Sequence, residues 1–590
     1  MSDRRTVLIV DDNPDLAGVT ASAIKKMIFP SSDGTEATVD VKPITAIAVD
    51  KQRLNTDRLA NEVFRENPAA VVLDVRLRGD EPDDLSGIDL AYKVKSLLPD
   101  CGVILITSYG VPSETRDLAQ NMAVFHSMID RCSELPVWTG DLFTALKATL
   151  ATHECTLSYR RKRFVQTVNG GRSDMWGLVL RPRDKCLVYE RQAPLPNLKS
   201  NSVVVKLLEI GVCGTNHASL GSGDLPKFDL VDFHEAFGKV VWTGEDVRDV
   251  QVGDYVVPMV RRCDTWDRPL LDGAPITAGS FDFRSCEWQT KECYRHPDEC
   301  PAKEYTEPGG DGTRIGYKSR GTGKCHGFGS EYWVDTEDWL VRFEPPPETE
   351  SCFRERMMKR YVLTEPMSVV WKARREILKH YTIRECGDNV LVVGIGPIGL
   401  LASLVMRTLH PGLGCTAVDV VDVGSTRAAH VLRLGMKYAQ APTEGSIPES
   451  LKGKKFEIIV EATDQPHIVF KNYSPLLAAG GIFTMIGLPD KSNATDFDPK
   501  SFEALVKNRN ILIGSINSAR SDFEESIAFM QRVVGDRDFV LDTMVKRLPI
   551  KEGCGEELIR LGKQDRRKRD YLKPVLSTFV NESESAATSG

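Results

Sequence analysis

Residues 389–406 read NVLVVGIGPIGLLASLVM, an apolar run that contains three glycines and one proline. The run begins as a buried strand and continues as a helix, with a G-x-G-x-x-G turn between them. Glycines at this spacing allow a tight turn, let the backbone approach a pyrophosphate and let helix and strand pack closely. The stretch therefore predicts a dinucleotide site in a parallel α/β domain. The expected contacts are Gly394, Gly396, Pro397, Ile398 and Gly399.

The next strand, CTAVDVV, ends in an acid that bears on the choice of cofactor. Asp419 lies 25 residues after Gly394, close to the spacing of an acid that holds the ribose hydroxyls. A carboxylate repels a 2′-phosphate, and Val420 and Val421 cannot bind one, so NAD is favoured over NADP. Arg427, in the following helix, could reach back to a 2′-phosphate, so the sequence does not exclude NADP.

Length and composition limit the class of protein. The 590 residues suggest about four compact units. A net charge of −7 argues against a nucleic-acid-coating protein, and 41% hydrophobic residues against a disordered one. Fourteen cysteines are too few for a disulfide scaffold. The chain shows no signal peptide or membrane span, and we expect a cytoplasmic protein that binds neither nucleic acid nor membrane.

The pattern of strands, helices and turns changes along the chain and predicts an α/β protein of several units. A doubly wound unit comes first, a β-rich unit follows, and strand–helix alternation then returns. The expected divisions are an α/β unit at 1–152, a linker with a solvated RRKR run at 153–172, a β-rich unit at 173–377 completed by 515–578, a nucleotide unit at 378–514 and a disordered tail at 579–590.

Polar side chains end three buried strands of the first unit. Asp11 and Asp12 follow the first strand, Asp74 ends the second, and Thr107 ends the third. The carboxyl ends of parallel strands meet at one edge of a sheet, so these groups converge. Three converging carboxylates repel each other unless a cation lies among them, and hard oxygen ligands suit Mg²⁺.

The motifs VLIVDDNPDLA, VVLDVRLRG, SGIDLA and ILITS resemble those of response-regulator receiver domains, which have a flavodoxin-like fold. The resemblance implies that Asp74 is the phosphoacceptor, with Asp11 and Asp12 at the Mg²⁺ site and Thr107 as the switch hydroxyl. It also implies a histidine kinase or another phosphodonor as partner. The family's lysine after the fifth strand is absent, and only Arg131 lies nearby. The sequence therefore leaves an alternative open, a receiver-like domain that serves only in docking or dimerisation.

Three segments of the later units offer ligands for a catalytic zinc. GVCGTN carries Cys213, DFHEAFG carries His234 and Glu235, and LTEPMSVV carries Glu365. A catalytic zinc takes three protein ligands and keeps one position open, and it acts as a Lewis acid on a substrate hydroxyl. Thr215 would then relay the hydroxyl proton.

The segments GVCGTN, HEAFG, VGDYVVP, TEPMSVV and GIGPIG resemble the zinc-dependent medium-chain dehydrogenases, and HPDECPAKEYTE, HGFGSEYWVD and GSINSARSDFEESI resemble their glucose dehydrogenase branch. The resemblance implies a GroES-like catalytic domain, a Rossmann domain and NAD(P)-linked oxidation of a sugar or another alcohol by a homo-oligomer. Glu235 and Glu365 would alternate in the zinc shell, Glu307 would contact the sugar, Asn517 cofactor or substrate, and Thr463 the nicotinamide side.

Several positions depart from that branch. Asn216 and Phe233 replace an aspartate and a glycine, and Val260, Val369 and Lys507 replace polar residues. Sugar recognition depends on buried polar groups matched to hydroxyls, so a modified sugar, a cyclitol or a simpler alcohol fits as well as glucose. A non-catalytic nucleotide-sensing signalling protein and a zinc-free reductase of the same superfamily are the alternatives.

Four cysteines at 263–300 fall in the stretch where the resembling superfamily often carries a structural zinc, so the resemblance implies a second zinc site there. Its four candidate ligands would complete a tetrahedral thiolate site, with Cys325 as an alternative fourth ligand. The alternative is a lobe of free thiols. The candidates are Cys263, Cys286, Cys293 and Cys300.

Overall fold

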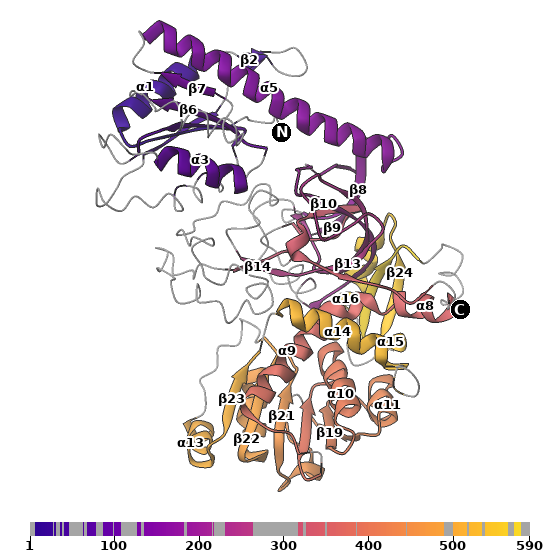
Figure 1. Ribbon diagram of the computed structural model, residues 1–590. Coiled ribbons are helices and arrows are strands. Elements are labelled where there is room, and N and C mark those ends of the chain that lie inside the picture. The colour runs from indigo at the N-terminus through magenta and orange to yellow at the C-terminus, as the bar shows by residue number, and fades with distance from the viewer. Residues whose placement is uncertain are drawn as a thin grey trace.

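Two parallel sheets lie at opposite ends of the computed structural model, with a β-rich unit between them (Figure 1). The structure describes all residues except 1–5, 28, 31–35, 38–39, 46–58, 60–62, 64–67, 78–85, 98–99, 108–126, 131–134, 182–185, 197, 215, 217–229, 264–316, 322–325, 348–350, 385, 444, 489–498, 516–517, 534–536, 538, 564–571 and 580–590.

The N-terminal unit is a five-stranded sheet in the order β4-β1-β5-β6-β7, and all its neighbouring strands are parallel. Each central strand is an apolar run buried on both faces, as a sheet covered by helices requires. The elements are β1 (Thr6–Asp11), α1 (Pro14–Lys25), β2 (Phe29–Pro30), β3 (Glu36–Ala37), β4 (Asp40–Thr45), β5 (Ala70–Asp74), α3 (Ser86–Leu97), β6 (Gly102–Thr107), β7 (Ser127–Asp130) and α5 (Leu135–Thr167).

Helix α5 belongs to two units. Its first half packs on the N-terminal sheet through Leu142 and Leu146, and its last turns reach the β-rich unit. There Phe164 is 1% exposed and its ring lies 5.2 Å from that of Tyr332. The segment 153–167, expected as a linker, is therefore helical. No glycine or proline interrupts it, and the buried Phe164 anchors its end.

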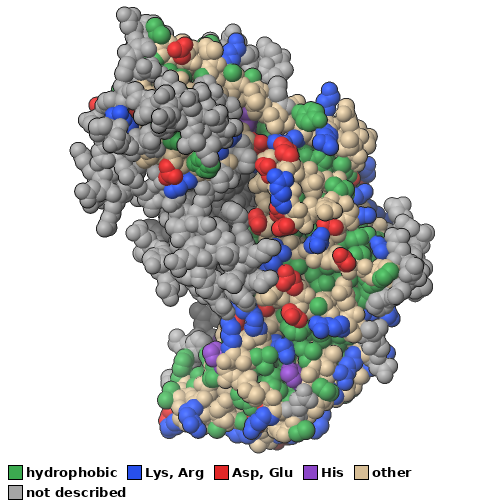
Figure 2. All heavy atoms as spheres, in the orientation of Figure 1, with side chains coloured by type: hydrophobic (Ala, Val, Ile, Leu, Met, Phe, Trp, Pro, Cys, Tyr) green, Lys and Arg blue, Asp and Glu red, His purple; other side chains and the backbone are tan. Residues whose placement is uncertain are grey.

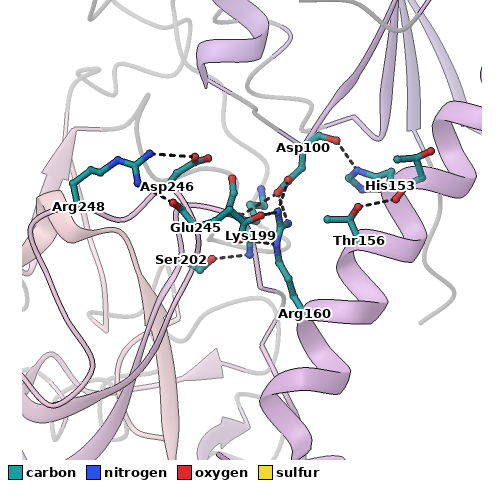
Figure 3. A network of polar contacts seen from close by, with 11 residues as sticks. Asp100, His153, Thr156, Arg160, Lys199, Ser202, Glu245, Asp246 and Arg248 are labelled. Atoms are coloured by element: carbon teal, nitrogen blue, oxygen red, sulfur yellow. Dashed lines mark hydrogen bonds and ion pairs between the residues drawn. The ribbon is translucent and has the colours of Figure 1, made fainter. Parts of the chain in front are cut away.

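The junction of the two units is a network of charged groups (Figure 3). Asp100, before β6, accepts bonds of 2.8 and 2.9 Å from Arg160 and one of 3.3 Å from the backbone N–H of Ser200. Arg160 also pairs with Glu245, between β12 and β13. Its side chain is only 6% exposed, so the expectation that the RRKR run is solvated is wrong at Arg160. Burial would lower the pKa of Arg160, but its bonds to Asp100 and Glu245 outweigh burial and raise it.

The β-rich unit contains a seven-stranded sheet in which β17-β13-β12-β10-β25-β24 lie in order and β16 also pairs with β10. A three-stranded sheet, β11-β8-β9, and the pair β14-β15 accompany it. The elements are β8 (Asp174–Arg181), β9 (Cys186–Pro194), β10 (Val203–Gly211), β11 (Leu230–Val231), β12 (Glu235–Thr243), β13 (Tyr255–Pro258), β14 (Arg261–Cys263), β15 (Tyr317–Ser319), β16 (Tyr332–Asp335), β17 (Leu340–Phe343), α8 (Ser351–Met358) and α9 (Thr364–His380).

The third unit is a six-stranded parallel sheet in the order β20-β19-β18-β21-β22-β23, the order of a doubly wound dinucleotide-binding fold. Helices pack on its two faces around apolar cores. The elements are β18 (Asn389–Val393), α10 (Pro397–Leu409), β19 (Gly414–Asp419), α11 (Thr426–Arg433), β20 (Lys437–Gln440), β21 (Phe456–Glu461), α12 (Pro466–Tyr473), β22 (Leu477–Met485), α13 (Pro499–Asn508) and β23 (Ile511–Gly514).

The chain then returns to the β-rich unit. α14 packs on α9, where Arg375 and Asp522 form an ion pair of 3.0 Å. β25 pairs with β10 in the antiparallel direction. On the face shown in Figure 2, acidic and basic side chains are interspersed over the described surface. Among the described residues, no helix is both long and apolar enough to span a membrane. The elements are α14 (Arg520–Arg532), α15 (Phe539–Thr543), β24 (Val545–Pro549), α16 (Cys554–Lys563) and β25 (Lys573–Ser577).

Candidate functional site

Cys213 lies in the loop that follows β10. Its backbone N–H donates to Oδ1 of Asn216 at 3.0 Å, and Nδ2 of Asn216 donates to Asp232 at 3.0 Å. Asn216 therefore both accepts from the loop and donates to a buried carboxylate, which an aspartate at this position could do only when protonated. Asn216 and Asp232 together fix the loop that carries Cys213.

His234 lies between β11 and β12 and is 5% exposed. Its Nδ1 lies 3.0 Å from the carbonyl oxygen of Gly321, a contact that leaves Nε2 available as a ligand. The preceding residue, Phe233, has a φ of 75°, in the left-handed region that favours glycine. Its buried ring and a 3.0 Å bond from the N–H of Phe328 to its carbonyl offset the cost of that conformation.

Glu235, the first residue of β12, is 1% exposed and forms an ion pair with Lys573 of β25. Sequence reasoning missed Lys573. The signal available to it was the lysine at the start of the apolar strand KPVLS, since a lysine is buried only if it has a partner.

These residues form one cluster. Ligand atoms of Cys213, His234 and Glu235 all lie within 4.8 Å of one another. The half-buried Glu365, in the first turn of α9, lies close enough to act electrostatically on His234 and Glu235. The pKa of Glu365 rises to about 7 because burial, and then Glu235, disfavour its charge.

The donor set fits a divalent zinc ion. One thiolate, one imidazole and carboxylates are the ligands of catalytic zinc sites. Burial would lower the pKa of His234, but Cys213, Glu365 and Glu235 outweigh burial and raise it to about 10. Such a negative environment favours a cation. Metal binding requires deprotonated ligands, so an ion bound here would replace the protons of these donor groups.

The nucleotide turn leads from β18 into α10. Gly394 has a φ of 89°, and a Cβ at Gly399 would lie 1.8 Å from the carbonyl oxygen of Gly394. At Gly396, by contrast, no atom lies within 4 Å of a Cβ position, so the space beside the amino end of α10 is open. An open space at a helix N-terminus fits the pyrophosphate of a dinucleotide.

Asp419 ends β19 and faces this turn. One of its oxygens accepts from the N–H of Ile395 at 2.7 Å, and the other from the N–H groups of Val420 at 2.7 Å and Val421 at 3.4 Å. Its carboxylate therefore joins the glycine-rich turn to the loop after β19.

Thr463 lies beside the same turn, where a Cβ on Gly394 would meet its Cγ2 at 2.7 Å. The buried carboxylate of Glu461, at the end of β21, accepts from the hydroxyl of Thr463 at 2.6 Å and from the N–H of Gly487 at 3.1 Å. Glu461 holds Thr463 in place. Sequence reasoning missed it, although an acid at the end of a buried strand was a signal.

At the carboxyl edge of the N-terminal sheet, oxygens of Asp11, Asp12 and Asp74 lie within 4.8 Å of one another. Thr107 is buried at the end of β6, one residue beyond Ile106, which pairs with Asp74. A Cβ on Gly87 would lie 1.8 Å from the carbonyl oxygen of Asp74, so the start of α3 packs closely on the cluster. This all-oxygen donor set fits Mg²⁺.

Several expected residues lie outside the described part of the chain, and for Cys263 only the backbone, in β14, is described. Lys507 lies on α13 with its side chain 71% exposed and pairs with Glu503. Val260 is buried at 9% exposure. The residues outside the described part are Thr215, Glu307, Asn517, Cys286, Cys293, Cys300, Cys325 and Arg131.

Two families match the chain: the alcohol dehydrogenase GroES-like domain over residues 199–344, and the glucose dehydrogenase C-terminus over residues 359–553. A glucose 1-dehydrogenase of Thermoproteus tenax is 30% identical over 348 residues, which cover 58% of this chain and 83% of the relative. The chain belongs to the glucose dehydrogenase family. Another glucose 1-dehydrogenase, from Methanocella arvoryzae, is 29% identical over 358 residues, covering 58% of this chain and 84% of the relative.

Solved structures agree on the fold. The glucose dehydrogenase of Haloferax mediterranei, in complex with NADP, Zn and gluconolactone, covers 69% of this chain and 100% of its own, with a TM-score of 0.53 and 22% identity. An alcohol dehydrogenase from Thermotoga maritima reaches a TM-score of 0.50 at 19% identity, covering 68% of this chain and 99% of its own. These findings confirm the GroES-like and Rossmann parts of the predicted fold, and the glucose 1-dehydrogenases among the relatives agree with the predicted sugar dehydrogenase.

Proposed function

We propose that the chain oxidises a sugar or a related polyhydroxylated alcohol by hydride transfer to a nicotinamide, with zinc held by Cys213, His234 and a carboxylate of Glu235 or Glu365. The observation that carries the proposal is the convergence of Cys213, from the loop after β10, with His234 and Glu235 at the start of β12. A zinc-free reductase or a nucleotide sensor has no need of such a donor set.

The residues of the cluster have distinct parts in this proposal. The contact of Nδ1 with Gly321 would leave Nε2 of His234 to hold the metal, and Cys213 is held by the turn that Asn216 closes. Zinc, when bound, supplies a Lewis acid that polarises the substrate hydroxyl. Thr215 relays the hydroxyl proton: its oxygen accepts that proton as its own hydroxyl proton passes on towards solvent. The glycine-rich turn and Thr463 orient the nicotinamide cofactor, which accepts the hydride.

A coupled assay tests this function. Purified protein is mixed with NAD⁺ or NADP⁺ and a series of aldoses, cyclitols and simple alcohols, and formation of the reduced cofactor is followed. We expect turnover with a sugar, and its loss in Cys213→Ser. Absence of turnover with every substrate would favour the nucleotide-sensing alternative. Glucose is one member of the series, because Val260 and Val369 replace polar groups of the family.

For the cofactor, we propose NAD with Asp419 as the ribose ligand. The solved relative holds NADP, so both nucleotides are compared. Asp419→Asn removes a charged acceptor, and we expect the KM for NAD⁺ to rise roughly 10- to 100-fold. Asp422→Asn, in the same loop, is the matched control. An NADP⁺ preference in the unaltered protein would contradict the assignment.

For the N-terminal unit, we propose a receiver in which Asp11, Asp12 and Asp74 bind Mg²⁺. Asp74 accepts a phosphoryl group from a histidine kinase or a small phosphodonor, and the hydroxyl of Thr107, as the switch residue, then hydrogen-bonds that group. Support comes from the 2-1-3-4-5 strand order and the convergence of the three carboxylates. Helix α5 and the Asp100–Arg160 pair give a physical route to the dehydrogenase.

Acetyl phosphate with Mg²⁺ tests the receiver. We expect the intact mass to rise by one phosphoryl group, and the gain to be absent in Asp74→Asn. Activity and oligomeric state are then compared with and without the phosphodonor. Equal values for the phosphorylated and unmodified protein would contradict a regulatory role, and absence of the mass gain would favour a docking role.

A further inference from the structure

Lys573 places a buried positive charge beside the cluster that we assign to zinc. Its side chain is 3% exposed, and that of its partner Glu235 is 2% exposed. A buried ammonium group repels a metal ion, so its presence needs a reason other than metal binding. Lys573 lies on β25, the last described strand along the chain, 360 positions after Cys213. None of the sequence motifs that carry Cys213, His234, Glu235 and Glu365 includes it.

The surrounding backbone keeps room for the Glu235–Lys573 pair. Gly211, at the end of β10, pairs with both Glu235 of β12 and Val575 of β25. A Cβ at Gly211 would lie 2.3 Å from Oε2 of Glu235 and 3.0 Å from Cε of Lys573. The two side chains therefore occupy the space that any other residue at 211 would fill.

The pair leaves the two oxygens of Glu235 in different situations. Oε2 forms the ion pair with the ammonium group of Lys573, and one carboxylate oxygen of Glu235 lies within 4.8 Å of donor atoms of Cys213 and His234.

We propose that Lys573 is a positioning residue of the metal site, which holds Oε2 of Glu235 so that this carboxylate cannot close around the metal with both oxygens. A catalytic zinc needs one open coordination position, and a second carboxylate oxygen would fill it. Lys573 thus keeps that position open for the substrate. The inference rests on the proposed zinc site.

Cobalt substitution tests this role, because the visible absorption of Co²⁺ falls when a fifth ligand joins four. The variants are Lys573→Met, Lys573→Arg and Lys206→Met, the last an exposed lysine of the adjacent strand β10. In Lys573→Met we expect metal affinity equal to or tighter than in the unaltered protein, weaker Co²⁺ absorption, and a roughly 10- to 100-fold fall in kcat. Lys573→Arg and Lys206→Met should retain the original spectrum.

A double-mutant cycle with Glu235→Gln keeps the test decisive if Lys573→Met does not fold, because the double variant removes both buried charges. If Lys573 acts through Glu235, then Glu235→Gln and Glu235→Gln/Lys573→Met have the same Co²⁺ spectrum and metal affinity. A difference between these two would overturn the inference, as would an unchanged spectrum and kcat in folded Lys573→Met.

Failure of the zinc site itself gives a different result. Unaltered protein would then bind no Co²⁺ that depends on Cys213, which overturns the proposed function together with this inference. Binding that depends on Cys213 but is insensitive to Lys573 overturns the inference alone.

Discussion

The N-terminal carboxylate cluster and the thiolate–imidazole cluster are built on opposite plans. Asp11, Asp12 and Asp74 lie at the ends of neighbouring parallel strands and offer oxygen alone. Cys213 and His234 come from loops of the β-rich unit, with a sulfur and a nitrogen donor and a lysine paired to the neighbouring carboxylate. Oxygen donors suit the hard ion Mg²⁺, and mixed donors suit zinc.

The difference shows how each site controls its charge. The N-terminal cluster offers oxygen donors of the kind that Mg²⁺ binds reversibly, so we expect its occupancy to follow the concentration of Mg²⁺. In the other cluster Lys573 neutralises part of the charge permanently, so the site is matched to one divalent ion. We therefore expect an exchangeable ion in the first site and a retained ion in the second.

Metal removal should separate the two sites most strongly. Treatment with a zinc chelator removes the Lewis acid, and we expect kcat/KM to fall about 10³-fold or more, since such an ion supplies several kcal/mol of stabilisation in the transition state. Steady-state assays then follow the addition of each ion. Zinc should restore the rate and Mg²⁺ should not; recovery with Mg²⁺ would remove the distinction between the sites.

Loss of a carboxylate should weaken only the exchangeable site. We expect Asp74→Asn to weaken Mg²⁺ binding roughly tenfold or more, measured by calorimetry. Residues that only hydrogen-bond the ligands of a metal already change its affinity by this factor. Asp89→Asn on α3, whose side chain is 54% exposed, is the matched control. Equal Mg²⁺ affinity in both variants would mean that the three aspartates do not bind the ion.

The junction between the units that carry the two clusters should matter less. Arg160→Ala removes a buried partner of Asp100, and we expect the free energy of opening of the last turns of α5, measured by hydrogen exchange, to fall by about 1.5–3 kcal/mol. The adjacent, exposed Arg161→Ala is the control. If both variants exchange alike, the network of Figure 3 does not hold the two units together.

The smallest effect concerns thiols. Burial raises the pKa of Cys101 to about 12, so the folded protein favours its neutral thiol, and this contribution to stability is lost as pH rises above the ordinary value of 9.0. At pH 8 we expect alkylation of Cys213 only after zinc removal, and no alkylation of Cys101 in either state. Mass spectrometry of the labelled peptides measures both; reaction of Cys213 in zinc-loaded protein would contradict its role as a ligand.

Sequence reasoning anticipated features that are local to a strand and the loop after it. Parallel strands align their carboxyl ends, so the strand pattern alone predicts that Asp11, Asp74 and Thr107 lie together. The turn at Gly394 and the acid at Asp419 followed in the same way.

What sequence reasoning could not supply depends on contacts between distant segments. Lys573 meets Glu235 only because β25 returns to pair with β10. Arg160 is buried only because Asp100 and Glu245, from two different units, meet at α5. The charged run at 160–163 gives no sign of those partners, since a solvated face has the same composition.

The most direct test of the central claim is the zinc content per chain of the unaltered protein, Cys213→Ala and Cys386→Ala, with the exposed Cys386 as the control. We predict that Cys213→Ala holds one equivalent less zinc than the unaltered protein and that Cys386→Ala holds the same amount. Equal zinc in all three proteins would contradict the assignment of Cys213 as a ligand, and with it the proposed dehydrogenase mechanism.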